Sequence, residues 1–294
     1  MKQPIFTGCA AAIVTPFRGA ALDAAALAGL IDWQIAGGCA AIVAAGTTGE
    51  SAVLSYPEHR ELVGMAVRLA AGRVPVLAGA GSNSTDHALT LVRQAEDAGA
   101  DALLLVTPYY NKTSQAGLIA HYTYLADRTT LPILLYNVPS RTGMTIAPET
   151  LALLAQHPGI VGVKEAGTDF DAISLAMRLC PPDFSFYSGN DSLALPLMAL
   201  GGRGLISVAA NLVPEAMSEL CRLCLAGQFQ DARSVHFEYL TLMKALFCDV
   251  NPIPIKAALG YAGLCSPETR LPLVPLSPQN QAALERVLQQ YGLM

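Results

Sequence analysis

Eight short apolar runs recur along the first 210 residues of this chain, and they constrain its fold more than any other feature. Each run is continuously apolar rather than alternating, as expected for parallel strands that are covered on both faces. Segments with helical spacing lie between the runs, often preceded by the Ser, Thr, Asp or Pro that helix starts favour. The runs occupy residues 9–17, 39–46, 74–81, 101–108, 132–139, 160–167, 184–189 and 204–210.

Eight successive strand–helix units predict an α/β fold of the closed (β/α)₈ (TIM) barrel type. The alternative is an open doubly wound sheet, but the glycine-rich phosphate loop typical of that fold does not follow the first run. After about residue 214 the runs stop, and residues 214–227, 228–247, 251–263 and 277–292 have helical patterns. We therefore expect a catalytic barrel over residues 1–227 and a C-terminal helical region over residues 228–294.

Composition narrows the class of protein. Apolar residues make up 52% of the 294 residues and charged ones 14%, which favours a large core and a surface apolar enough for subunit contacts. A net charge of −5 without a basic run argues against nucleic-acid binding. The sequence contains no recognisable signal peptide or membrane span. Seven cysteines, several in apolar patterns, favour free thiols and a cytoplasmic location.

In barrels of this type the active site lies at the carboxyl ends of the strands. The residues that end the predicted strands here are rich in hydroxyl groups and include one arginine and one lysine. They include Thr47, Thr48, Tyr109, Tyr110, Tyr136, Ser140, Arg141, Lys164, Ser188 and Ser207.

Lys164 is the strongest candidate for a catalytic residue. Of the five lysines in the chain, it alone has strand-like apolar flanks, in the stretch VGVKEAG. Burial lowers the pKa of a lysine by up to about 3–5 units, and the neutral amine then forms a Schiff base with a carbonyl substrate. A structural role, with the ammonium group reaching water or pairing with Glu165, is the alternative. Neighbouring residues in a strand point to opposite faces, which argues against that pairing.

Three further features have both a functional and a structural interpretation. Tyr136 lies on the preceding strand and could serve as a general acid or base beside Lys164, or simply cap the core. The stretch GTTGES offers hydroxyls and backbone N–H groups to a carboxylate, or is an ordinary capped turn. Arg141 could bind a second carboxylate, or be an exposed loop residue.

Metal binding is not expected. Cys221 and Cys224 have C-x-x-C spacing, but they lie in a helical pattern without a second pair. The five histidines are scattered and form no H-x-x-x-H pair.

Taken together, the motifs of this chain resemble those of the 4-hydroxy-tetrahydrodipicolinate synthase (dihydrodipicolinate synthase) family. The resemblance runs from about Phe6 to the C-terminus. This family belongs to the pyruvate-dependent class I aldolases, which include N-acetylneuraminate lyase. The motifs, in chain order, are GTTGES, TPYYNKTSQAG, ILLYNVPSRTG, VGVKEAG, YSGND, GLISVAAN and NPIPIK.

The resemblance implies a carbon–oxygen lyase of lysine (diaminopimelate) biosynthesis that condenses pyruvate with L-aspartate 4-semialdehyde. Lys164 would form the imine with pyruvate, so no metal or organic cofactor would be required. Tyr136, Thr47 and Tyr110 match the family's proton relay, with Tyr110 reaching in from a neighbouring subunit of a homotetramer. Thr48 and Arg141 match the residues that bind the two substrate carboxylates, and Gly189 and Ile206 match positions that line the pocket.

The resemblance also implies a possible site for feedback inhibition by L-lysine. Ser51, Ala52, His59, Asn83 and Tyr109 match that site, whereas Tyr56 and His87 replace the histidine and glutamate that lysine-sensitive relatives often carry. We therefore expect weak or absent lysine inhibition. Two other functions remain open: another pyruvate aldolase, acting on a sugar acid or a different aldehyde, and a catalytically inactive barrel that serves as a binding protein.

Overall fold

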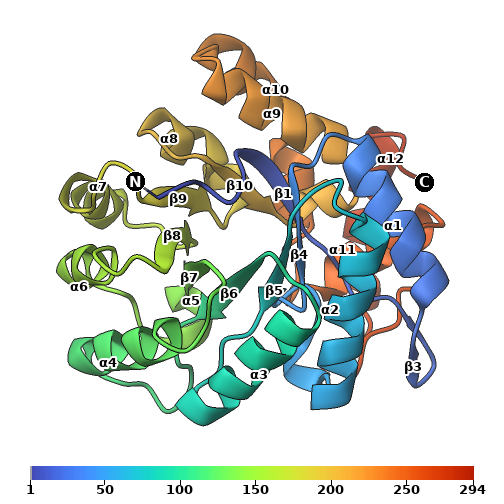
Figure 1. Cartoon of the computed structure of the whole chain (residues 1–294). Coiled ribbons are helices and arrows are strands. Elements are labelled where there is room, and N and C mark those ends of the chain that lie inside the picture. Colours follow the sequence, from blue (N-terminus) through green and yellow to red (C-terminus); the bar gives the residue numbers. More distant parts are fainter. Residues whose placement is uncertain (1) are drawn as a thin grey trace.

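Eight parallel strands close into a barrel in the computed structural model, which describes residues 2–294 (Figure 1). Around the barrel each strand pairs with the next in the order β1-β4-β5-β6-β7-β8-β9-β10, and β10 closes on β1. The predicted (β/α)₈ barrel is therefore confirmed. The strands are β1 (Gly8–Ala12), β4 (Ala41–Ala44), β5 (Val76–Gly79), β6 (Ala102–Val106), β7 (Ile133–Asn137), β8 (Ile160–Glu165), β9 (Ser185–Ser188) and β10 (Gly204–Ser207).

Helices surround the barrel, and a short hairpin of β2 (Phe17–Arg18) and β3 (Ala21–Leu22) follows β1. Several helices start where the sequence places a capping side chain; Ser55, for example, forms a capping box with Glu58 at the start of α2. The helices up to the last strand are α1 (Ala24–Ala36), α2 (Tyr56–Ala70), α3 (Thr85–Asp97), α4 (Gln115–Ala126), α5 (Pro139–Thr142), α6 (Pro148–Leu154), α7 (Phe170–Leu179) and α8 (Ala194–Ala199).

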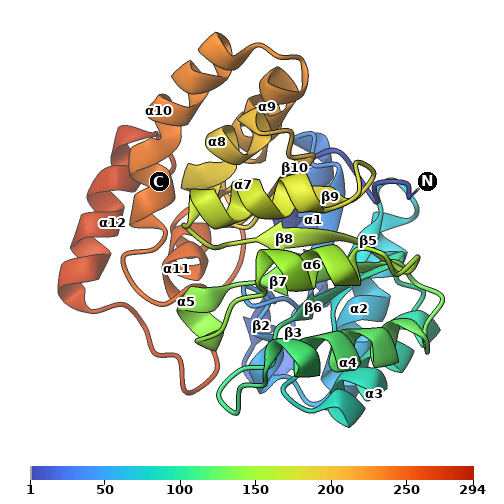
Figure 2. The same ribbon diagram turned by 90° about the vertical axis from the view of Figure 1, so that its left-hand side faces the viewer.

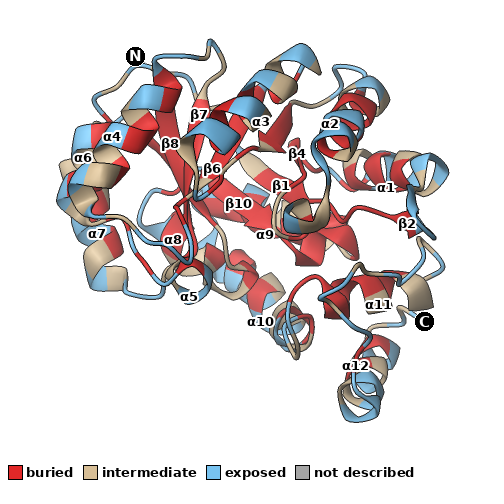
Figure 3. Cartoon of the chain, turned by 90° about the horizontal axis from the view of Figure 1, so that it is seen from below, coloured by how far each residue is buried: buried red, intermediate tan, exposed pale blue. Residues whose placement is uncertain are grey.

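The strands separate two apolar layers. Side chains such as Leu134 and Ile206 fill the barrel interior, whereas Ile133 and Leu135 pack outward against the helices. Both faces of each strand are thereby covered, which explains why the strands appear as continuous apolar runs. Figure 3 shows the buried strands at the centre and exposed faces on the surrounding helices.

Strand register places the two central candidates side by side. Tyr136 on β7 pairs with Lys164 on β8, and the next pair is Asn137 with Glu165. Because side chains alternate along a strand, the first pair and the second point to opposite faces. Tyr136 accordingly belongs to the interior cluster.

The four helices predicted after residue 214 are confirmed as α9 (Pro214–Leu225), α10 (Phe229–Ala245), α11 (Ile253–Tyr261) and α12 (Pro278–Gln290). Figure 2 shows α10, α11 and α12 gathered on one side of the barrel. The domain boundary at residue 227 remains a prediction. Cys221 and Cys224 are buried in α9, with their thiols free. No helix within residues 2–294 is long and apolar enough to cross a membrane.

The closing contact of the barrel provides a test of the fold. A Cβ atom added at Gly204 on β10 would lie 1.9 Å from the carbonyl oxygen of Gly8 on β1, so Gly204→Ala must push these strands apart. We expect a loss of about 3 kcal/mol or more in the free energy of unfolding, measured by chemical denaturation.

Gly29 in α1 provides the matched control. It is exposed, and an added Cβ there would meet nothing within 4 Å. Gly29→Ala should therefore raise stability by about 0.5–1 kcal/mol, through helix propensity alone. Equal effects of the two substitutions would contradict the strand contact described here.

Candidate active site

A cavity of about 400 Å³ opens at the carboxyl ends of the strands, where the sequence predicts the active site. It is lined by candidates from four strand ends and by residues from the segment between α10 and α11. The lining residues are Thr47, Thr48, Tyr136, Val138, Ser140, Arg141, Lys164, Ala166, Gly189, Asn190, Val208, Phe247, Asp249, Val250 and Asn251.

Lys164 lines this cavity and is 5% exposed. Its Nζ makes no hydrogen bond or ion pair with any described residue and lies 4.5 Å from the centre of the Tyr136 ring. Burial lowers the pKa of Lys164 to about 8; the charge of Asp191 opposes this shift, and that of Arg141 adds to it. A substantial fraction of the amine is therefore neutral near neutral pH, as a nucleophile requires.

A second buried lysine provides a useful comparison. Lys256 on α11 is fully buried, but its Nζ donates hydrogen bonds to Glu50 at 2.6 Å and to the Thr15 carbonyl at 2.9 Å. These partners stabilise its charged form. Lys164 lacks such partners and faces a cavity, so the two lysines have different chemical roles. Sequence reasoning missed the burial of Lys256, although it is the only charged residue of the otherwise apolar helix IPIKAALGY.

Tyr136 is buried beside Lys164, and burial raises the pKa of its phenol. The Arg141 charge and the Thr47 hydroxyl have the opposite effect, and both residues line the same cavity. The phenol is therefore protonated at neutral pH and can donate a proton to a bound substrate.

Glu165 does not pair with Lys164, as the alternation along the strand predicts. Its carboxylate accepts hydrogen bonds from the Asn137 side chain at 2.9 and 3.1 Å and from the Gly167 backbone at 2.6 Å. The same carboxylate therefore fixes the backbone that follows β8, on the side opposite the lysine amine.

The ends of β9 and β10 shape the cavity around the lysine stem. A Cβ atom at Gly189 would lie 3.0 Å from Lys164 Cε and 2.8 Å from Ala166 Cβ, so only glycine leaves the lysine in place. Asp191 is buried next to this turn and accepts hydrogen bonds from the Ser207 hydroxyl and from backbone N–H groups at residues 208 and 209. It is the buried carboxylate whose charge favours the ammonium form of Lys164.

Arg141 is exposed at the mouth of the cavity. Asn251 connects it to the threonine pair, Thr47 and Thr48. The Asn251 carbonyl accepts a 3.5 Å hydrogen bond from Arg141, and its Nδ2 donates to Thr48 Oγ1 at 3.0 Å. Asn251 Oδ1 is buried and has no partner among residues 2–294. Sequence reasoning missed Asn251, although it begins the NPIPIK motif.

Two predicted residues lie away from this cavity. Tyr110 is 92% exposed, with a φ of 65°, and projects from the loop after β6. Ile206 is fully buried in the barrel interior and is not among the lining residues, whereas Val208 is.

A second cavity of about 510 Å³ adjoins the first and shares Thr47, Val138, Arg141, Val250 and Asn251 with it. Most residues matched to the lysine site line it: Ser51, Ala52, Tyr56, His59, His87 and Tyr109. Asn83 lies beside them and donates a hydrogen bond to the Tyr109 carbonyl at 3.2 Å. Burial lowers the pKa of His59, whose Nε2 contacts the Gly79 carbonyl at 2.7 Å.

Known proteins match this chain over almost its full length. A 4-hydroxy-tetrahydrodipicolinate synthase from Persephonella marina is 46% identical and covers 99% of this chain and 100% of its own. The crystal structure of dihydrodipicolinate synthase from Thermotoga maritima is 44% identical, with a TM-score of 0.97 and coverage of 99% of this chain and 100% of its own.

A further structure, a lysine-bound relative from Cyanidioschyzon merolae, is 38% identical, with a TM-score of 0.96 and coverage of 99% of this chain and 100% of its own. The model of the dihydrodipicolinate synthetase family matches residues 5–291. This chain belongs to the dihydrodipicolinate synthetase family.

Proposed function

We propose that this protein condenses pyruvate with L-aspartate 4-semialdehyde to 4-hydroxy-tetrahydrodipicolinate, in lysine (diaminopimelate) biosynthesis. The chain is a lyase of the aldolase type, like its full-length relatives. The observation that carries the proposed mechanism is the unpaired, buried amine of Lys164 in a cavity lined by Tyr136 and Thr47.

In the first step, the neutral Lys164 amine attacks the carbonyl carbon of pyruvate. The carbonyl oxygen leaves as water, with protons relayed through Tyr136 and Thr47, and an imine forms. Thr48 and nearby backbone N–H groups bind the pyruvate carboxylate. A methyl C–H bond then loses its proton to the same relay, its electron pair forms a carbon–carbon double bond, and the π pair of the protonated imine moves onto nitrogen, which gives an enamine. This electron sink is why we propose that no metal or organic cofactor is required.

In the second step, the enamine carbon attacks the aldehyde of the semialdehyde, whose oxygen takes up a proton. The amino group of the same substrate then adds to the imine carbon, closes the ring and displaces the Lys164 amine. Arg141, exposed at the mouth of the cavity, binds the carboxylate of the incoming semialdehyde. A short acceptor with a carboxylate suits this arginine better than a polyhydroxylated sugar, which would need more hydroxyl and amide partners.

We also propose that the protein acts as a cytoplasmic homotetramer in which Tyr110 completes the proton relay of a neighbouring subunit. Its phenol is 92% exposed at the edge of the loop after β6, where it is available to a partner. A tyrosine this exposed has no packing role within its own chain.

Turnover is the direct test of this function. Purified protein should consume pyruvate with L-aspartate 4-semialdehyde and not with N-acetylmannosamine. Lys164→Ala should abolish turnover, because the imine cannot form. Arg141→Ala should lower kcat/KM for the semialdehyde by about 10- to 100-fold, the effect of one lost charge-assisted contact.

Lys244→Ala is the control, because this lysine is exposed on α10 and should leave turnover unchanged. Activity with the sugar alone would preserve the imine chemistry and refute the assigned acceptor. Consumption with neither aldehyde would refute the proposed reaction.

Imine formation should depend on pH in a way that follows from the charges around Lys164. The reactive species is the neutral amine, and the pKa of Lys164 is about 8. The initial rate of borohydride trapping with pyruvate should therefore rise with pH through about 8 and then level off.

Two variants should shift this profile in opposite directions. Arg141→Met removes a charge that lowers the pKa of Lys164, so the midpoint should move to higher pH. Asp191→Asn removes a charge that raises this pKa, so the midpoint should move lower. Shifts of the same sign in both variants would contradict the assigned electrostatics.

L-Lysine should inhibit this protein weakly or not at all. The second cavity has Tyr56 and His87, with ring centres 6.2 Å apart, at the positions where lysine-sensitive relatives often carry a histidine and a glutamate. The carboxylate that does line this cavity, Glu50, is already bonded to Lys256 and to the Arg270 backbone. The double substitution Tyr56→His/His87→Glu should increase lysine affinity by about one to two decades, because a charged hydrogen bond contributes about 1.5–3 kcal/mol. Inhibition of the unmodified protein by low-micromolar lysine would refute this prediction.

A further inference from the structure

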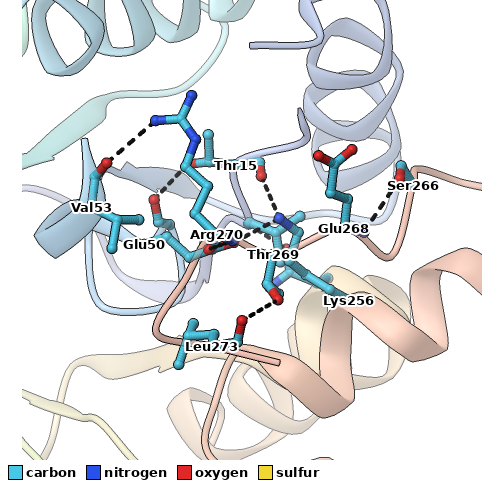
Figure 4. A network of polar contacts seen from close by, with 12 residues as sticks. Thr15, Glu50, Val53, Lys256, Ser266, Glu268, Thr269, Arg270 and Leu273 are labelled. Carbon is cyan, nitrogen blue, oxygen red and sulfur yellow. Dashed lines mark hydrogen bonds and ion pairs between the residues drawn. The ribbon is translucent and has the colours of Figure 1, made fainter. Parts of the chain in front are cut away.

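A buried ion pair joins the barrel to the C-terminal helical region behind the proposed active site. Lys256 of α11 bonds to Glu50, which follows β4, and to the carbonyl of Thr15, which follows β1. The other carboxylate oxygen of Glu50 accepts a hydrogen bond from the Arg270 backbone at 3.0 Å. Figure 4 shows these four residues meeting from separate segments of the chain.

The pair is enclosed by aromatic and cationic side chains. Lys256 Nζ and Arg270 Cζ each lie 4.3 Å from the centre of the Phe17 ring, which is fully buried. Arg270 also donates to Glu58 Oε1 at 2.6 Å and to the Val53 carbonyl at 3.3 Å. The Lys256–Glu50 pair therefore has little freedom to move. It fixes the positions of the chain segments that it joins.

One of those segments carries the threonine pair. Glu50 ends the loop that contains Thr47 and Thr48, and its backbone N–H donates to the Thr47 carbonyl at 3.1 Å. Glu50 has a φ of 55°, a left-handed conformation that is unfavourable for a non-glycine residue. One carboxylate oxygen of Glu50 pairs with Lys256 and the other accepts a hydrogen bond from the Arg270 backbone. These two contacts hold Glu50 in that conformation.

The other segment carries Asn251, which lies on the chain just before α11. Asn251 contacts Thr48 directly and Arg141 through its carbonyl, as described above. Lys256 thus connects two walls of the same cavity through α11: the threonine loop and the segment that follows α10. A buried ion pair adds little net stability compared with apolar side chains of similar size, so stability alone does not explain its presence.

We propose that Lys256 and Glu50 are positioning residues, which hold the hydroxyls of Thr47 and Thr48 and the amide of Asn251 against bound pyruvate. Neither side chain lines the cavity that contains Lys164, although Glu50 borders the adjoining second cavity. The proposal rests on the proposed function for the identity of the substrate.

The test uses the double variant Lys256→Met/Glu50→Gln. Methionine keeps the packing against Phe17, and glutamine keeps an acceptor for the Arg270 N–H, so no buried charge is left unpaired. We expect a folded protein in which borohydride and pyruvate still label Lys164 completely. The pyruvate concentration for half-maximal labelling should rise by about tenfold, and kcat/KM for pyruvate should fall by about 100-fold.

Two further variants keep the test decisive. Leu288→Ala creates a cavity in α12, away from the site, and should lower stability without changing half-maximal labelling. Thr15→Val, a milder change, removes the Thr15 hydroxyl, which donates to the Gly49 carbonyl of the same loop at 2.6 Å. It should raise the half-maximal pyruvate concentration by roughly threefold to tenfold.

A folded double variant with unchanged half-maximal labelling and unchanged kcat/KM would overturn the positioning role. If the double variant does not fold, the isosteric single variant Glu50→Gln, which removes the charge from the pair, replaces it, and unchanged half-maximal labelling in that variant would overturn the positioning role. Borohydride labelling of Lys164 needs pyruvate but not the semialdehyde. The positioning role can therefore be supported or refuted even if the protein does not accept the semialdehyde. Absence of semialdehyde turnover in the unmodified protein would refute the proposed function and not the positioning role.

Discussion

An amine buried without a counter-ion is the central physical constraint in this structure. Taking an ammonium group out of water is costly, and a lysine in that position responds with a lowered pKa. Lys164 has this environment because β8 contributes it to the lining of a barrel cavity, beside Tyr136. The surrounding residues set its charge balance: Asp191 favours the ammonium form and Arg141 disfavours it.

The two buried lysines of this chain illustrate how environment determines chemistry. Both are almost inaccessible to water, and desolvation lowers the pKa of each. Lys256 donates hydrogen bonds to a carboxylate and a carbonyl, which stabilise its charged form in a structural contact. Lys164 faces a cavity and the ring of Tyr136, so its amine is available for a reaction. Burial by itself therefore does not distinguish the two lysines, whereas the presence or absence of a bonding partner does.

Most of the fold and part of the site could be predicted from the sequence. Continuous apolar runs predicted the strands, and strand order placed Tyr136 on the strand next to that of Lys164. That the two residues pair directly depends on the register, which the structure shows. The Lys256–Glu50 pair could not be predicted, because its members are 206 residues apart. The apolar flanks of Lys256 could have indicated its burial, but not its partner. The same holds for Asn251, whose contact with Thr48 depends on how the chain returns over the barrel.

The return of the chain over the barrel has a consequence for how this scaffold can diversify. The strands carry the proposed nucleophile, but the segment that holds Phe247, Val250 and Asn251 forms one wall of the cavity. Insertions or substitutions there change the shape offered to the second substrate without disturbing the strand carrying Lys164. In this architecture, the wall that would face the acceptor can change in evolution while the strand that carries the proposed nucleophile stays fixed.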